Sequence, residues 1–96
     1  MTRRRRASLI VVAYDVADDR VRDRVARVLL ETGGRRIQRS VFELETDAES
    51  LSILRRRLAR LRGAEDSIAY YRLCRACRRQ TIYAGPGARS EGGDRQ

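Results

Sequence analysis

Several residue types on which enzymes and binding modules depend are missing from this chain of 96 residues, or are rare in it. There is no histidine, so neither a Ser–His–Asp set nor a zinc site with histidine ligands can form. Aromatic residues make up only 5% of the sequence, too few to favour a sheet that stacks RNA bases on exposed rings. No glycine-rich phosphate loop is present either. Candidate chemistry therefore has to come from carboxylates and arginines.

Cysteine is scarce, with two residues, Cys74 and Cys77, in a CxxC spacing. Two cysteines do not suggest a disulfide framework. Structural zinc needs four ligands, which only two chains together could supply, and a thioredoxin-type redox role lacks its structural context. The simplest interpretation is that the pair shapes the link between the last two strands.

Long apolar runs are absent, and no stretch of eighteen apolar residues could span a membrane. Arg3–Arg6 followed by the apolar Leu9–Ala13 resembles the start of a signal peptide, but the run is short and Asp15 ends it without a cleavage site. We therefore expect a cytoplasmic protein in which residues 1–7 form a basic leader.

Arginine is what the chain has in excess. There are 22 basic residues, all arginine, against 13 acidic ones, which gives a formal net charge of +9. Guanidinium groups stay charged and bind phosphate through two parallel hydrogen bonds. The excess favours a nucleic-acid partner over an acidic membrane surface, and over a surface that is merely solvated. Binding through arginine–phosphate contacts should weaken steeply with salt.

Hydrophobic periodicity divides the chain into strands and helices. Apolar β-branched runs or two-residue alternation indicate strands, and apolar stripes at helical spacing indicate helices. Thr46 and Glu49 have the spacing of a capping box at the start of the second helix. The predicted elements are a strand at 8–14, a helix at 18–32, extended structure at 35–45 with a turn near 38–40, a helix at 46–62, and strands at 67–73 and 80–84.

This element order predicts an α+β protein of the ferredoxin-like βαββαβ type with an extra C-terminal strand. Two helices would cover one face of an antiparallel sheet, in one domain at residues 8–84, followed by a flexible tail at 85–96. The first strand is apolar on both sides although one face of such a sheet is open. A second copy packed on the open face would cover it, so we expect a homodimer.

Asp15 is the best candidate for chemistry, because it directly follows the buried first strand. Mg²⁺ is often held by one or two carboxylates with water and substrate phosphate, and two copies meeting at a dimer axis would supply a pair. The alternative is that Asp15 only caps the turn into the first helix. Spacing alone leaves both interpretations open.

Three segments in this order suggest a family. Val11–Val16, Gln38–Glu43 and Asp66–Cys74 contain a "YD" strand end, a "Q-x-S-V-F" strand and a tyrosine-rich strand. Together they resemble the Cas-two family of CRISPR-associated proteins, in register over about residues 8–84. The resemblance implies a ferredoxin-like homodimer in which the last strand of each chain completes the sheet of its neighbour.

The same resemblance implies a role in the spacer-acquisition stage of prokaryotic adaptive immunity, with the Cas-one integrase as partner. It also implies metal-dependent cleavage of phosphodiester bonds in single-stranded RNA or double-stranded DNA, with one Mg²⁺ shared across the dimer and Asp15 as the metal-binding and catalytic residue. The positions associated with activity or nucleic-acid contact are Tyr14, Arg22, Arg24, Arg36 and Phe42. The alternatives are a non-catalytic dimer that bridges integrase and spacer DNA, or an RNA-cleaving toxin on a similar fold.

Overall fold

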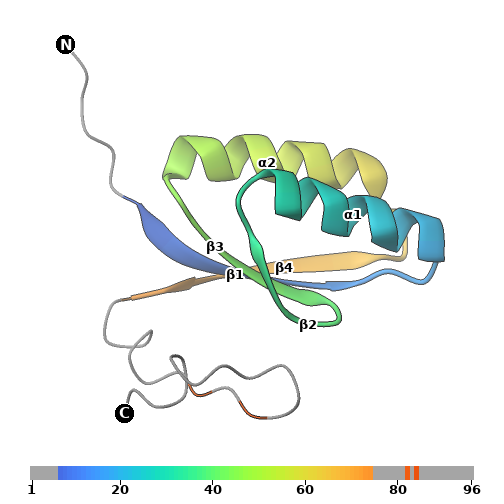
Figure 1. The fold of residues 1–96 in the computed structure, drawn as a ribbon. Coiled ribbons are helices and arrows are strands. Elements are labelled where there is room, and N and C mark those ends of the chain that lie inside the picture. Colours follow the sequence, from blue (N-terminus) through green and yellow to red (C-terminus); the bar gives the residue numbers. More distant parts are fainter. Residues whose placement is uncertain (1–6, 75–81, 83, 85–96) are drawn as a thin grey trace.

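The computed structural model describes residues 7–74, 82 and 84, and Figure 1 shows their arrangement. Their regular elements alternate as the periodicity predicts. In chain order they are β1 (Ser8–Asp15), α1 (Asp19–Glu31), β2 (Arg35–Gln38), β3 (Val41–Thr46), α2 (Ala48–Leu61) and β4 (Ser67–Leu73). The predicted split of the segment at 35–45 is confirmed, with a turn at Arg39 and Ser40.

The strands form one sheet in the order β2-β3-β1-β4, and β1 runs antiparallel to both of its neighbours. Both helices lie on the same face of this sheet (Figure 1). This is the predicted ferredoxin-like arrangement, with β1 in the centre and β4 at an edge of the described sheet. Central placement explains why β1 is the most apolar strand.

The core lies between the sheet and the helices. Because side chains alternate across a strand, Ile10, Val12 and Tyr14 of β1 all face the helices, and each is at least nine-tenths buried. The helices contribute Leu29 of α1 and Leu58 of α2 to this core, and both are fully buried. Burying a side chain of this size stabilises the fold by about 1.5–3 kcal/mol.

Helix α1 begins and ends where its sequence signals lie. Asp18 is the N-cap, and its Oδ1 accepts hydrogen bonds from the backbone N–H groups of Arg20 and Val21 at 2.8 and 3.1 Å. At the other end Gly33 adopts a φ of +98°, a left-handed conformation that glycine tolerates without strain.

Helix α2 starts one residue later than the predicted capping box requires. Its N-cap is Asp47, whose Oδ1 accepts a 2.7 Å hydrogen bond from the N–H of Ser50. The prediction of a capping box formed by Thr46 and Glu49 was therefore wrong. Thr46 instead remains in β3, where it pairs with Ser8 of β1, so the neighbouring carboxylate takes over the cap.

The second face of the sheet is covered by neither helix (Figure 1). Leu9, Val11 and Ala13 of β1 point to this open face, and Val11 stands between Glu43 of β3 and Tyr71 of β4. Glu43 is buried there and forms an ion pair with Arg35 of β2. The apolar character of β1 on both sides is thus confirmed.

Some sequence-based predictions fall outside the described residues. These are residues 1–6 of the predicted leader at 1–7, most of the predicted strand at 80–84, the tail at 85–96, and Cys77. Cys74, the other cysteine of the CxxC pair, is described and exposed. Among the described residues, no helix is long and apolar enough to cross a membrane.

Candidate nucleic-acid interface

Asp15 occupies the last position of β1, at the rim of the open face. Its backbone pairs with Ser67, the first residue of β4, and its side chain is exposed. Since successive side chains alternate, Asp15 shares the open face with Val11 and Ala13 rather than pointing toward the helices. Within the described part of the chain, no hydrogen bond or ion pair engages its carboxylate. The strand therefore presents a rigidly placed carboxylate with its oxygens available.

The alternative role for Asp15, as the cap of the first helix, is taken by Asp18. The two backbone N–H groups at the start of α1 hold the pKa of Asp18 below its ordinary value, and the charges of Arg20 and Arg24 add to the effect. Asp18 is thus a carboxylate committed to the fold. Because Asp18 fills the cap, the fold does not use Asp15 for this purpose.

Arg22 and Arg24 both lie on the first turns of α1, but their surroundings differ. Arg22 donates through Nη1 to the carbonyl of Val16 at 3.3 Å and forms an ion pair with Asp19, so it braces the connection from β1 to α1. Arg24 is exposed. Arg24 is therefore the freer of the two to contact phosphate, while Arg22 holds the backbone beside Asp15.

Three further predicted residues, Tyr14, Phe42 and Arg36, form one stack. The Tyr14 and Phe42 rings are 6.2 Å apart between centroids, with an angle of 27° between their planes. The guanidinium of Arg36 lies 5.1 Å from the centroid of the Phe42 ring. Both rings are buried, whereas Arg36 is exposed. Arg36 is thus the accessible member of the stack, and the two rings lie behind it.

Tyr14 also joins β1 to the turn between β2 and β3. Its hydroxyl donates to the carbonyl of Arg39 over 3.5 Å, and its backbone N–H donates to the carbonyl of Ser40 at 3.0 Å. The burial of Tyr14 agrees with the apolar run at 8–14, but its contacts with the turn at 39–40 could not be predicted from the sequence. The contact makes Tyr14 a residue that places its neighbour Asp15.

A metal ion would find only part of a coordination shell in one chain. Among the described residues, no three His, Cys, Asp or Glu side chains cluster together. Asp15 offers an exposed oxygen donor of the kind that hard divalent cations prefer, at the open face where a second copy would contribute its equivalent. The donor set therefore fits half of a shared site.

A basic hollow between α2 and β4 was missed by the sequence reasoning. It has a volume of about 410 Å³ and is lined by Arg55, Arg56 and Arg62 from the helix side and by Ile68 and Tyr70 from the strand. Cations near a helix C-terminus are favourable in themselves, so the sequence gives no reason to expect a binding site at these three arginines. The spacing of 55, 59 and 62 marks one helix face, but only the fold shows that β4 lies below it.

Comparisons with known proteins agree with this arrangement. Residues 8–81 match the family model described as CRISPR associated protein Cas2. A CRISPR-associated endoribonuclease Cas2 of Chloroflexus aurantiacus is 38% identical over 79 residues, which cover 80% of this chain and 84% of the relative. A CRISPR-associated endonuclease Cas2 of Thermus thermophilus is 44% identical over 64 residues, covering 66% and 70%. The crystal structure of Streptococcus pyogenes Cas2 superposes with a TM-score of 0.72 at 26% identity, covering 80% of this chain and 99% of that one.

Proposed function

This chain belongs to the Cas2 family of CRISPR-associated proteins, and we propose that it acts as a homodimeric, metal-dependent endonuclease of the spacer-acquisition stage. Relatives carry the names endoribonuclease and endonuclease, which supports cleavage of phosphodiester bonds as the reaction. Single-stranded RNA or double-stranded DNA is the proposed substrate, the cytoplasm the proposed location, and the Cas-one integrase the proposed partner.

The observation that carries this proposal is the carboxylate of Asp15, which is exposed at the end of a rigid central strand and does not serve as a helix cap. Two copies that pack through their open faces would bring two such carboxylates into one interface, where they could hold one Mg²⁺. A bound divalent ion supplies Lewis acidity and lowers the pKa of water. The dimer also covers the apolar side chains Val11 and Ala13, which are only half-buried on the open face of one chain.

The surrounding residues have separate tasks in this proposal. Arg24, exposed on α1, binds phosphates near the strand to be cut. Arg36 is exposed on the helix side of the sheet, because it pairs with the core residue Phe42, so it binds phosphates away from the Asp15 carboxylate. Arg22 holds the carbonyl of Val16 and thereby fixes the chain that leaves Asp15. Tyr14 and Phe42 act from the core, where their stack supports Arg36 and the start of the turn.

The test is a cleavage assay on labelled single-stranded RNA and double-stranded DNA, with and without Mg²⁺. The Asp15→Asn variant keeps the side-chain shape and removes the charge, so we expect cleavage to fall by a factor of 100 or more, on the order of one catalytic group. Asp23→Asn is the matched control, because Asp23 is an exposed carboxylate on α1. Equal cleavage by wild type and Asp15→Asn would show that Asp15 is not catalytic.

A second candidate function is a non-catalytic dimer that bridges the integrase and spacer DNA. The half-complete metal site and the many exposed arginines favour it. In a spacer-acquisition assay this function predicts that Asp15→Asn is active, whereas Arg24→Glu with Arg36→Glu is not. Cleavage and bridging are separable properties of one fold, so the cleavage assay and the spacer-acquisition assay test the two functions independently.

A further inference from the structure

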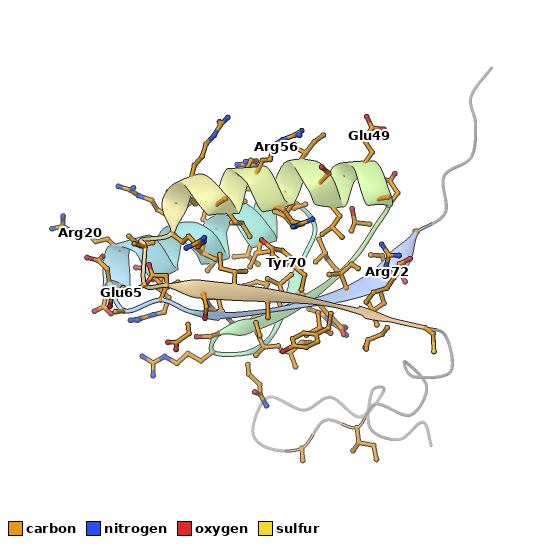
Figure 2. The ribbon with its side chains drawn as sticks, turned by 180° about the vertical axis from the view of Figure 1, so that it is seen from behind. Arg20, Glu49, Arg56, Glu65, Tyr70 and Arg72 are labelled. Atoms are coloured by element: carbon orange, nitrogen blue, oxygen red, sulfur yellow. The ribbon has the colours of Figure 1, made fainter. Side chains whose placement is uncertain are left out.

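The hollow between α2 and β4 lies on the helix side of the sheet, opposite to the open face that carries Asp15. Figure 2 shows Tyr70 on β4 beneath α2, with Arg56 on the helix above it and Arg72 further along the strand. Ile68, Tyr70 and Arg72 all point to this side of β4, because they alternate with the open-face residues. The hollow is thus separate from the proposed cleavage site.

Within the described part of the chain, no ion pair with a carboxylate neutralises the arginines of the hollow. Arg62 donates through Nη1 to the carbonyls of Gly63 and Asp66, at 3.0 and 3.2 Å, which fixes the side chain but leaves its charge. Arg55 and Arg56 form no ion pair with any described residue. Asp66 is engaged by the backbone N–H groups of Ala17 and Gly63. An anion would therefore enter without displacing an existing ion pair.

Tyr70 at the floor supplies a neutral hydroxyl. Burial raises the pKa of Tyr70 above its ordinary value, and the nearby charges of Arg55 and Arg62 only partly offset this effect. The guanidinium of Arg55 lies 5.8 Å from the centroid of the ring. Arg55 thus engages the ring through a cation–π contact, and the Tyr70 hydroxyl is a hydrogen-bond donor.

We propose that the α2–β4 hollow, formed by Arg55, Arg56, Arg62 and Tyr70, binds the sugar-phosphate backbone of a nucleic acid, and that this contact is independent of base sequence. Arg72 extends the basic row by about 7 Å along the strand, which suits a chain of phosphates better than a single small anion. The proposal rests on the proposed function only in that nucleic acid is the ligand.

The experiment compares two double variants of the full chain that change the same charge on the same helix. Arg55→Gln with Arg56→Gln removes two guanidiniums from the hollow. Arg57→Gln with Arg60→Gln is the control, because neither residue lines the hollow and Arg57 pairs with Glu31 of α1. Glutamine and arginine have similar helix propensities, so both variants should fold.

The readout is the affinity for a fluorescent DNA duplex, measured by anisotropy at several salt concentrations. For the hollow variant we expect the slope of log K against log salt to become shallower by about 1.8, the value for two lost phosphate contacts. For the control variant, the same slope should change by less than half of this amount. Equal shifts in both variants, or none in either, would overturn the proposal.

Two further arms separate this proposal from its alternatives. If inorganic phosphate binds the wild type but not the hollow variant while DNA affinity is equal in both, the hollow takes a small anion and the proposal is wrong. If the hollow variant binds DNA like wild type and Asp15→Asn still abolishes cleavage, the further inference fails and the proposed function stands. If the wild type binds neither RNA nor DNA, the proposed function itself fails.

Discussion

Asp15 and Ser67 form the last backbone pair between β1 and β4, and this pairing places the Asp15 carboxylate at the rim of the open face. Three residues later Asp18 caps α1 with its own carboxylate. Two aspartates close in sequence thus have different roles, one in folding and one exposed at the end of a strand. This division decides which carboxylate is available for a metal ion.

The first prediction concerns metal stoichiometry. If two copies share one ion through their Asp15 carboxylates, calorimetric titration with Mn²⁺ should saturate at about one ion per two chains, since Mn²⁺ takes the same oxygen ligands as Mg²⁺. Asp15→Asn should abolish the binding and Asp23→Asn should leave it unchanged. A stoichiometry of one ion per chain that persists in Asp15→Asn would contradict the shared site.

A second prediction concerns the open face as the dimer contact. Tyr71 on this face is 55% exposed in one chain, and Tyr71→Arg would place a charge where a second copy is expected to pack. Light scattering should then show a monomer. Ile53→Arg is the control, because Ile53 has a similar exposure of 47% on α2. If Ile53→Arg abolishes the dimer and Tyr71→Arg does not, the two copies contact each other through their helices and not through the open face.

A third prediction concerns the pH dependence of stability at the α1 cap. Since the folded-state pKa of Asp18 lies below its ordinary value of 3.8, Asp18 contributes stability fully above that value and loses it as the pH falls through the folded-state pKa. Asp18→Asn still caps the helix but does not titrate. The difference in melting temperature between wild type and Asp18→Asn should therefore shrink from pH 7 to pH 3. A constant difference would refute the assignment.

A fourth prediction separates positioning from catalysis at Tyr14. Its hydroxyl makes only a 3.5 Å contact with the Arg39 carbonyl, and the side chain is buried. Tyr14→Phe should retain the fold and cleave within about threefold of wild type, the effect of one weak hydrogen bond. The rate constant and the substrate affinity should be measured separately. A loss as large as that of Asp15→Asn would instead show that the hydroxyl takes part in the reaction.

Much of the fold follows from local patterns in the sequence. Strand β4 spans Ser67–Leu73 as its composition predicts, and α1 ends at the Gly33 and Gly34 stop. The start of α2 differed because Thr46 satisfies both a cap and a strand, and its pairing with Ser8, far away in the sequence, decides between them. Such a choice depends on tertiary contacts that no local window contains.

The candidate site divides in the same way. The arginine excess, the helical and strand periods, and the position of Asp15 after an apolar run can all be predicted from the chain, because they are properties of neighbouring residues. Folding is needed to stack Tyr14 on Phe42 behind Arg36, and to place Arg55 over Tyr70 at the floor of a basic hollow. Those relationships join different elements, and they exist only once the helices have packed on the sheet.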